Sequence, residues 1–447
     1  MSLMSRHYFG TDGIRGVAGT PPMTAEFAFL VGVAAAEALK GAGRDAPTVL
    51  IGRDTRRSGQ MLLAALVAGL TSRGAHAVEL GILPTPGVSH LCRSLGAAAG
   101  VVISASHNPY ADNGIKFFSA DGEKLSDALE TEIESYIEGA GALSSVTGAD
   151  IGSFERYDRG SGHEYRDFLV ASGPDLSGLK IGLDCANGAA YKLAPEIFTL
   201  LGADVRVINA EPDGLNINTG CGSTHPEAIA HFVQTEALDL GVTFDGDADR
   251  ALLVDRSGRL ISGDHMLAIC ALYRHEQAVV STIMGNLGLE HYLAARGVTF
   301  HRAAVGDRYV HEMLRTKGLS LGGEQSGHVL FLDKAPTGDG ILSALQTLAA
   351  VQGSSKTLEA WFDEITMYPQ TLLNVRVDPL VKARLAEHQQ VMAALQEASL
   401  RLNGEGRVNV RPSGTEPLVR VMVEGRDQVM IEQVARDIAA VVERATL

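Results

Sequence analysis

Three aspartates follow an apolar run, Leu240 to Phe244, that we predict to be a buried strand. They stand at alternate positions, as Asp245, Asp247 and Asp249, with only glycine and alanine between them. Such a loop can curl until the three carboxylates meet on one hard cation, which prefers oxygen ligands. An EF-hand is the alternative, but Arg250 stands where its loop would need glycine. A solvated acidic turn does not account for three carboxylates directly behind a buried strand, so we predict a Mg²⁺ site.

A serine follows a second apolar run. Ala97 to Ile103 is typical of a buried strand, and Pro109 prevents the pairing from continuing. Ser106 is thereby placed at the carboxyl end of a strand, where open α/β sheets bind their ligands. We predict that Ser106 carries a covalent phosphate. A Ser-His hydrolase is the alternative, but the side chains of Ser106 and His107 would diverge in an extended segment, and no G-x-S-x-G elbow surrounds the serine.

The stretch from Gly322 to His328 has the composition of a ligand-binding loop between two apolar runs. Glu324 and Ser326 can accept and donate hydrogen bonds to sugar hydroxyls, and His328 can exchange a proton near neutral pH. A glycine-rich hairpin with exposed polar side chains is the other interpretation.

A phosphate clamp is the prediction for the last part of the chain, Arg411 to Arg420. The hydroxyls of Ser413 and Thr415, the backbone N–H groups around Gly414 and the Arg411 guanidinium can together hold a phosphate. The Arg420 guanidinium can donate a second pair of hydrogen bonds to the same phosphate. An ordinary Pro-Ser-Gly turn is the alternative, and two arginines with two hydroxyls favour phosphate.

Two cations are open to either of two interpretations. Arg15, in a loop among glycines, can face the site or form a surface ion pair. Lys116, ten residues after the serine, can return to it as a cation or proton carrier, or lie on the surface.

The elements that would position these residues form a repeated βαβ pattern. A strand, a glycine-bearing loop, a helix, a glycine turn and a second strand recur three times, with first strands at Thr48 to Gly52, Leu179 to Asp184 and Ala278 to Ile283. Three α/β domains follow from this pattern: residues 1–152, 153–257 and 258–369.

Residues 370–447 have a different pattern and are predicted to form a small α+β domain. We expect strands at Leu372 to Asp378, Gly406 to Val410 and Leu418 to Glu424, with helices at Pro379 to Leu402 and Gln428 to Thr446.

Composition excludes several classes of partner. The net charge of −15 over 447 residues argues against nucleic acid or an anionic membrane as the main partner. Four widely separated cysteines, Cys92, Cys185, Cys221 and Cys270, are typical of reduced thiols. No signal pattern or apolar span is present in the sequence, so we expect a cytoplasmic protein with no membrane partner.

Taken together, the motifs resemble the α-D-phosphohexomutase superfamily, most closely the bacterial phosphoglucosamine mutases. The resemblance runs from Gly10-Thr-Asp-Gly-Ile-Arg-Gly16 to Arg411-Pro-Ser-Gly-Thr-Glu-Pro417, with all four motifs in the order of the superfamily. It implies three related α/β domains with mixed sheets and a C-terminal, TATA-binding-protein-like α+β domain, arranged around a central cleft. A homodimer is compatible with the resemblance.

The resemblance also implies a role for each motif. Ser106 would be the phosphoserine, and its phosphate would bind Mg²⁺ together with Asp245, Asp247 and Asp249. Sugar hydroxyls would be held by Glu324 and Ser326. The non-reacting phosphate would be held by Arg411, Ser413, Gly414, Thr415 and Arg420. Proton transfer would fall to Lys116 or His328, and charge near the serine would be stabilised by Arg15 and Arg250.

The implied reaction interconverts glucosamine 6-phosphate and glucosamine 1-phosphate through a glucosamine or glucose 1,6-bisphosphate intermediate or primer. It would supply UDP-N-acetylglucosamine synthesis, and so cell-wall precursors. Ser104 and Gln325 stand where relatives acting on mannose or glucose phosphates usually have threonine and methionine. A phosphomannomutase or phosphoglucomutase is the first alternative, and a phosphosugar phosphatase or a non-catalytic phosphosugar sensor are the others.

Overall fold

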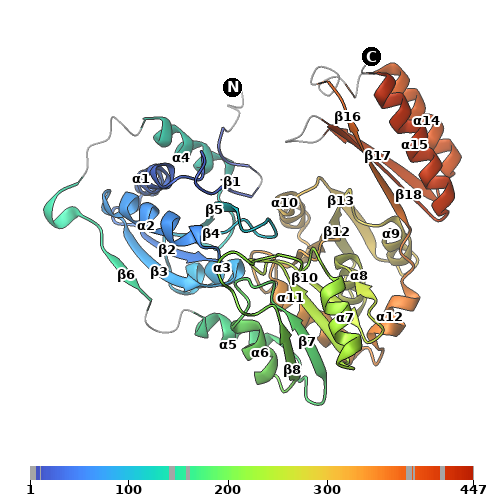
Figure 1. Cartoon of the computed structure of the whole chain (residues 1–447), viewed down its shortest axis with the longest axis horizontal. Coiled ribbons are helices and arrows are strands. Elements are labelled where there is room, and N and C mark those ends of the chain that lie inside the picture. The colour runs from blue at the N-terminus through green and yellow to red at the C-terminus, as the bar shows by residue number, and fades with distance from the viewer. Residues whose placement is uncertain are drawn as a thin grey trace. The chain divides into compact units, whose positions relative to one another are not determined.

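Four β-sheets with flanking helices make up the described part of the chain in this computed structural model (Figure 1). It describes residues 7–10, 12–139, 146–157, 162–378, 385, 388–412 and 418–445. Two compact units divide the chain: Met1–Met284 with Phe300–Phe362, and Gly285–Thr299 with Asp363–Leu447. The first unit holds the first two sheets and nearly all of the third, and the second unit holds the fourth.

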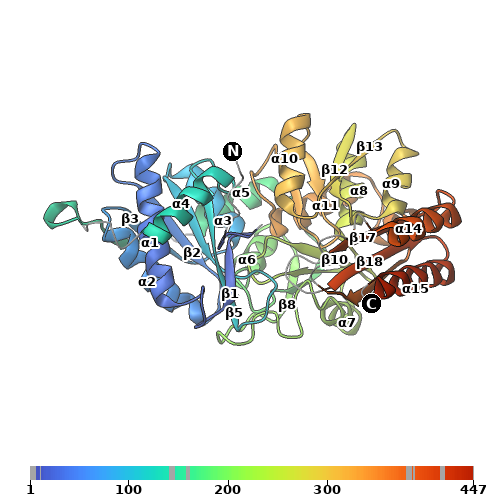
Figure 2. The same cartoon turned by 90° about the horizontal axis from the view of Figure 1, so that it is seen from above.

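The first sheet has six strands in mixed directions, in the order β1 (Ile14–Val17), β5 (Asp112–Ser119), β4 (Ala99–Ile103), β2 (Thr48–Arg53), β3 (His76–Ile82) and β6 (Phe154–Arg156). On one face lie the helices α1 (Ala25–Gly41), α2 (Ser58–Thr71) and α4 (Asp127–Gly139), and on the other lies α3 (Thr85–Ser94) (Figure 2). Helices α1 and α2 approach closely through glycines, since a Cβ at Gly32 would meet the Leu66 carbonyl oxygen at 2.3 Å. Strand β4 is buried along its whole length, as expected for a strand covered on both faces.

The second sheet has the order β11 (Leu260–Ile261), β10 (Ala251–Asp255), β9 (Leu240–Phe244), β7 (Lys180–Asp184) and β8 (Asp204–Ile208). Its neighbouring helices are α5 (His163–Ser172), α6 (Leu193–Leu200) and α7 (Glu227–Thr235). Strands β9 and β10 form an antiparallel hairpin, which places the aspartate loop at its tip.

The third sheet has the order β13 (Thr299–Ala303), β12 (Ala278–Thr282), β14 (Leu321–Gly323) and β15 (Val329–Phe331). Helices of this part are α8 (Gly263–Tyr273), α10 (Asp307–Lys317), α11 (Gly340–Gly353) and α12 (Leu358–Glu364), while α9 (Leu287–Ala294) belongs to the second unit. The β14–β15 hairpin carries the predicted sugar loop at its turn.

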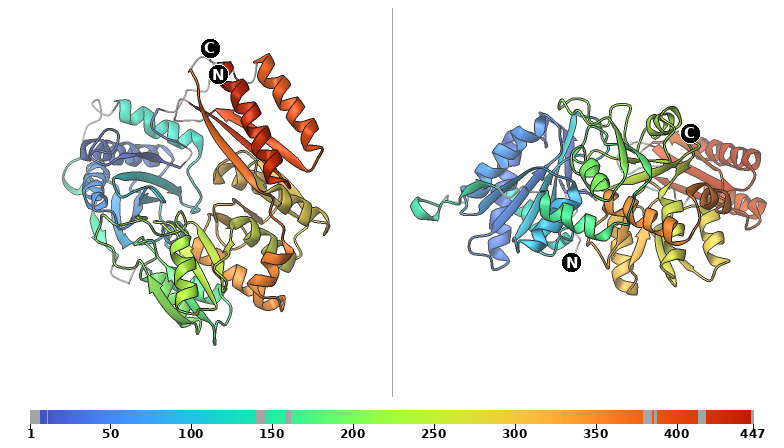
Figure 3. Two further views of the ribbon diagram at one scale, coloured as in Figure 1. Left: turned by 45° about the vertical axis from the view of Figure 1, so that its right-hand side comes forward. Right: turned by 90° about the horizontal axis from the view of Figure 1, so that it is seen from below.

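The fourth sheet is fully antiparallel, in the order β16 (Gln370–Arg376), β18 (Leu418–Gly425) and β17 (Gly406–Pro412). Two helices, α14 (Gln389–Leu402) and α15 (Gln428–Arg444), lie side by side against it (Figure 3). Valines of β18 and apolar residues of both helices form its core.

The predicted fold class is confirmed, with mixed sheets in three α/β regions and an α+β region at the C-terminal end. One helix begins later than predicted: α14 starts at Gln389 rather than at Pro379, and most of the stretch between lies outside the described residues. All four cysteines are buried and free. Among the described residues, no helix has the length and apolar character needed to cross a membrane.

Candidate active site

Ser106 lies in the loop that follows β4, as predicted, with only 1 % of its surface exposed. Its hydroxyl donates a hydrogen bond to Asp245 Oδ2 at 2.6 Å, although the two residues are 139 positions apart in the chain. The backbone of Ser106 has a φ of 52°, which is uncommon for a residue other than glycine. The fold therefore brings the predicted phosphate carrier directly against the first aspartate of the predicted metal loop.

The prediction that Ser106 and His107 diverge is wrong. The positive φ of Ser106 turns the chain instead of extending it, and the serine Oγ lies 3.3 Å from His107 Nδ1. The same ring nitrogen lies 3.2 Å from an Arg250 Nη1. Burial and the charges of Arg250 and Arg15 lower the pKa of His107 to about 4. The nitrogen nearest the serine thus also faces a guanidinium, whereas in a triad that nitrogen takes the serine proton and a carboxylate binds the other one, so the hydrolase interpretation is disfavoured for a different reason.

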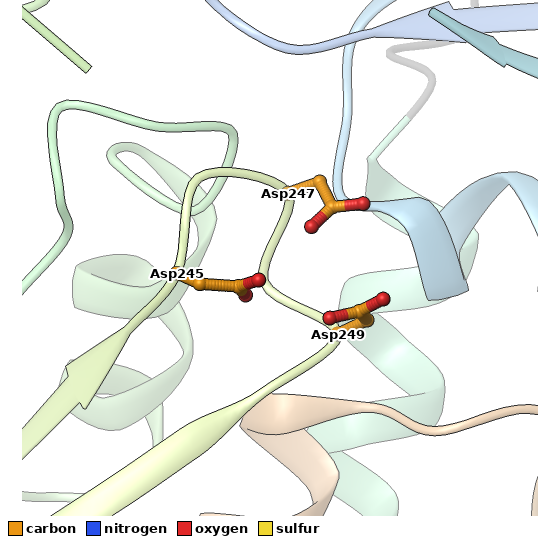
Figure 4. Close-up of side chains that lie close together, drawn as sticks. All are labelled: Asp245, Asp247 and Asp249. Atoms are coloured by element: carbon orange, nitrogen blue, oxygen red, sulfur yellow. The ribbon is translucent and has the colours of Figure 1, made fainter. Parts of the chain in front are cut away.

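The carboxylates of Asp245, Asp247 and Asp249 point toward one another from the loop between β9 and β10 (Figure 4). Each offers one oxygen, and these oxygens lie within 4.8 Å of one another. Asp247 Oδ1 and Asp249 Oδ1 are buried and accept no hydrogen bond from any described residue. Burial, and then the charges of Asp249 and Asp247, raise the pKa of Asp245 well above its ordinary value. Unsatisfied buried oxygens and like charges are what a divalent cation would neutralise, so the residues fit the predicted metal.

Lys116, on β5, faces the aspartates rather than the surface. Its Nζ lies 2.8 Å from Asp247 Oδ2, 3.0 Å from Asp12 Oδ2 and 3.6 Å from Asp249 Oδ2. Burial disfavours the charged form, but these carboxylates outweigh it and raise the pKa of Lys116. Lys116 is therefore an ammonium cation at neutral pH in this arrangement.

A series of partly buried charges that the sequence did not predict continues from Lys116. Asp12 bridges Lys116 and Lys124, whose Nζ lies 2.7 Å from Asp12 Oδ1. Lys124 lies 2.7 Å from Asp307 Oδ2, and that oxygen lies 3.9 Å from His328 Nε2. This series of charges joins the first α/β region to α10 of the third. In the sequence, only the glycine-rich motif around Asp12 indicated any part of it.

Both predicted arginines lie at this site. Arg15, on β1, forms an ion pair with Asp12. Arg250 lies 3.8 Å from Asp249 Oδ1 through its Nε, and its backbone N–H donates to Asp245 Oδ1 at 3.2 Å. Burial disfavours the Arg250 charge, but Asp249 and Asp245 outweigh it and raise its pKa. Arg250 thus contacts the aspartate loop directly, whereas Arg15 contacts Asp12, which in turn pairs with Lys116.

The predicted sugar loop is the turn between β14 and β15. His328 is 2 % exposed, and its Nε2 lies 3.9 Å from Asp249 Oδ2, while Glu324 is half-buried and Ser326 is exposed. The loop is hydrogen-bonded to the β9–β10 hairpin that carries the three aspartates, because Ala251 N donates to the Gly327 carbonyl at 3.1 Å. Polar side chains that face outward from a fixed loop are available to a ligand.

The predicted phosphate clamp is described only in part. Arg411 and Arg420 are paired residues on the neighbouring strands β17 and β18. Burial, and then the Arg420 charge, lower the pKa of Arg411. Ser413, Gly414 and Thr415 lie outside the described residues.

Comparison with protein-family models gives four matches in chain order. Domains I, II and III of phosphoglucomutase/phosphomannomutase, each described as alpha/beta/alpha, match residues 6–143, 163–258 and 262–368. The C-terminal domain of phosphoglucomutase/phosphomannomutase matches residues 372–441.

A phosphoglucosamine mutase of Deinococcus deserti is 58 % identical over 441 residues, which cover 99 % of each chain. The chain belongs to the phosphoglucosamine mutase family. Solved structures share the fold at lower identity. A phosphoglucomutase/phosphomannomutase family protein from Burkholderia thailandensis has a TM-score of 0.81 at 24 % identity, covering 97 % of both chains. Aspergillus fumigatus N-acetylphosphoglucosamine mutase, in complex with GlcNAc-6P and magnesium, has a TM-score of 0.67 at 19 % identity, covering 99 % of this chain and 96 % of that one.

Family membership accounts for the order of the motifs. The structure adds two side chains, Thr85 and Ser104, that contact the motif loops. Thr85 donates to Asp247 Oδ2 at 2.6 Å, and so supports the metal loop from α3. Ser104, taken as a mark of sugar choice, is fully buried, and its hydroxyl donates to Asp54 at 2.6 Å. The Ser104 side chain is therefore closed to solvent and contacts the Ser106 loop from within the protein.

Proposed function

We propose that the chain interconverts glucosamine 6-phosphate and glucosamine 1-phosphate, the activity after which its curated relatives are named, with Ser106 as the phosphate carrier. The single observation that supports this most is the contact of Ser106 Oγ with Asp245, beside two further aspartates and the Lys116 cation. A serine among groups that neutralise phosphate charge is suited to phosphoryl transfer, which depends mainly on alignment and electrostatics.

The reaction has two transfers. In the first, the bond between phosphorus and Ser106 Oγ breaks, a bond to O1 of glucosamine 6-phosphate forms, and the O1 proton passes to a base. The serine oxygen regains a proton, and the product is a 1,6-bisphosphate. This bisphosphate reorients in the site. Its 6-phosphoryl group is then transferred to Ser106: the serine hydroxyl loses its proton, O6 gains one, and glucosamine 1-phosphate is released.

The site residues take complementary roles in this proposal. Asp245, Asp247 and Asp249 would hold Mg²⁺, which when bound neutralises charge on the transferring phosphoryl oxygens. Lys116 stays protonated beside the aspartates, which favours it as a charge stabiliser and leaves His328 as the candidate for proton transfer.

Substrate recognition is assigned to two loops. Glu324 and Ser326 bind sugar hydroxyls, and Arg15 and Arg250 stabilise charge near the serine. The non-reacting phosphate is bound by Arg411, Ser413, Gly414, Thr415 and Arg420. The Aspergillus enzyme, solved in complex with GlcNAc-6P and magnesium, supports an amino-sugar phosphate and Mg²⁺ as the ligands.

The test is a coupled assay with glucosamine, glucose and mannose 6-phosphates at equal concentrations. We expect turnover of glucosamine 6-phosphate to exceed the other two. Equal or faster turnover of mannose phosphate would contradict the proposed substrate, and stoichiometric release of inorganic phosphate would indicate a phosphatase. Binding without turnover would indicate a sensor. Mapping of phosphate to the peptide with Ser106 then tests the carrier, since an active preparation without phosphate there would exclude it.

We propose domain boundaries near residues 152, 257 and 369, a cytoplasmic location, a homodimeric assembly and a place in the supply of UDP-N-acetylglucosamine.

A further inference from the structure

The side chain of Arg56, just before α2, is fully buried beneath the Ser106 loop. Its Nε forms an ion pair with Asp54 Oδ2 at 2.8 Å. Its remaining nitrogens donate to backbone carbonyls of the loop, at 2.8 Å to Ser106, 2.9 Å to Asn108, 2.5 Å to Pro109 and 3.2 Å to Asp112. A single guanidinium thus holds four carbonyls of one loop, which a lysine ammonium with three donors could not do.

Asn218, from the second α/β region, binds the same loop from the other side. Its Nδ2 donates to the Ser106 carbonyl at 2.8 Å and to the Asn108 carbonyl at 3.0 Å. Each of these two carbonyls therefore accepts one hydrogen bond from Arg56 and one from Asn218. Both lone pairs of each oxygen are used, which defines the orientation of both peptide groups.

The hydrogen bonds continue to the amide of the reacting residue. Asp54 Oδ2 also accepts from Ser104 Oγ, and Ser104 Oγ accepts from the Ser106 N–H at 3.0 Å. The N–H and the carbonyl of Ser106 are thus both held at its φ of 52°. This conformation is unfavourable for a residue with a Cβ, so it persists because the surrounding bonds impose it.

The metal loop packs against the same carbonyl. A Cβ at Gly246 would lie 2.6 Å from the Ser106 carbonyl oxygen and 2.8 Å from Asn218 Nδ2. Glycine between Asp245 and Asp247 therefore lets the metal loop and the serine loop meet at the position that Arg56 and Asn218 define.

We propose that Arg56 and Asn218 are positioning residues that hold Ser106 Oγ in line with the aspartates for both phosphoryl transfers. The inference rests on the proposed function. In-line transfer depends on the alignment of Ser106 Oγ, and Arg56 and Asn218 maintain that alignment without touching the reacting atoms. If the two residues served only to stabilise the fold, their loss would lower the melting temperature without changing turnover per folded molecule.

The test compares Asn218→Ala with the matched control Asn209→Ala. Both asparagines lie in the second α/β region at positive φ, and Asn209 donates its Nδ2 to Asp184 instead. Two quantities are measured on each folded protein: kcat and KM for glucosamine 6-phosphate, and the rate at which glucose 1,6-bisphosphate phosphorylates Ser106, followed by intact mass. For Asn218→Ala we expect kcat and the phosphorylation rate to fall about 10- to 100-fold with KM within about twofold, while Asn209→Ala stays within about twofold in all three.

Arg56→Lys adds a second comparison, because lysine keeps the charge beside Asp54 but cannot bind four carbonyls. A loss of kcat like that of Asn218→Ala is expected, whereas full rescue by lysine would overturn the role of Arg56. Equal kcat for Asn218→Ala and Asn209→Ala would overturn the inference even if Arg56→Lys does not fold. A wild type that is phosphorylated but does not isomerise would contradict the proposed function, and the phosphorylation rates would still decide this inference.

Discussion

The Ser106 site and the arginine pair of the small domain handle charge in opposite ways. Around Ser106, cations and carboxylates alternate, so that Lys116 lies between Asp247 and Asp12. On β17 and β18, Arg411 and Arg420 are paired across the sheet with like charge, and burial and Arg420 lower the pKa of Arg411. Like charges directly opposite on neighbouring strands are destabilising.

This difference separates two tasks. The alternating charges of the Ser106 site are arranged before any ligand arrives, which is what stabilisation of a transition state requires. The Arg420 charge lowers the pKa of Arg411, and an anion bound beside both guanidiniums would counteract that effect. We expect substitutions in the first region to act on turnover and substitutions in the second to act on binding.

The largest effect is expected for Ser106→Ala. Removal of the covalent carrier should lower kcat by at least about 10⁴-fold, since no hydroxyl remains to carry the phosphoryl group between the two transfers. The protein should remain folded and still bind glucosamine 6-phosphate. Ser94→Ala, at an exposed position, is the control and should retain full activity. An active Ser106→Ala protein would move the chemistry to another residue.

Asp245→Asn should separate activity from stability. Burial and two like charges raise the pKa of Asp245 above its value in the unfolded chain, so the ionised form costs the folded state free energy at neutral pH. With chelator present, the variant should therefore melt a few degrees above the wild type, while its activity with Mg²⁺ falls about 100-fold or more. Adding Mg²⁺ should raise the melting temperature of the wild type more than that of the variant.

Asp255→Asn is the matched control at the other end of the same hairpin. Asp255 is buried but accepts hydrogen bonds from Arg259 Nε at 2.7 Å and from two backbone N–H groups. Neutralising a carboxylate that is already paired should lower the melting temperature. A lower melting temperature for Asp245→Asn in chelator would show that its charge is compensated without metal.

A smaller effect, on KM, is expected for Arg411→Met. Loss of one of the two guanidiniums of the clamp should raise KM for glucosamine 6-phosphate about 10-fold, with a weaker effect on kcat. Stability should not fall, because the substitution also removes a like-charge contact. Arg407→Met on the same strand is the control. Arg407 pairs with the buried Glu424 at 2.5 Å, so its loss should destabilise the protein and leave KM unchanged. The reverse pattern would remove the distinction between the two arginines.

The sequence predicts well where chemistry follows a local pattern. The aspartate loop could be predicted because its apolar strand, small spacers and carboxylates are adjacent in the chain. The link from Lys124 to Asp12 and Asp307 could not, because its partners are 112 and 183 residues away and only the packing of two α/β regions brings them together.

Backbone conformation was the other limit. Ser106 and His107 were expected to diverge because an extended segment was assumed, and the positive φ at Ser106 is imposed by Arg56 and Asn218 from distant parts of the chain. A conformation maintained by distant partners leaves no local signal in residue types. Arg56 itself resembles any arginine in a polar loop until its burial is known.

The smallest effect concerns a buried carboxylate outside the metal set, Asp339, which caps α11. It accepts hydrogen bonds from the Tyr165 hydroxyl and from Leu342 N–H, and burial raises its pKa to about 6. Because this pKa lies above that of the unfolded chain, the ionised group costs stability above pH 6, and the cost disappears as the pH falls toward 4. Asp339→Asn avoids the cost, so the variant should melt a few degrees above the wild type at pH 8, and the difference should shrink by pH 5. Tyr165→Phe removes a donor to the carboxylate and should steepen the pH dependence. A difference between Asp339→Asn and wild type that does not change with pH would mean that Asp339 is as well compensated as Asp255.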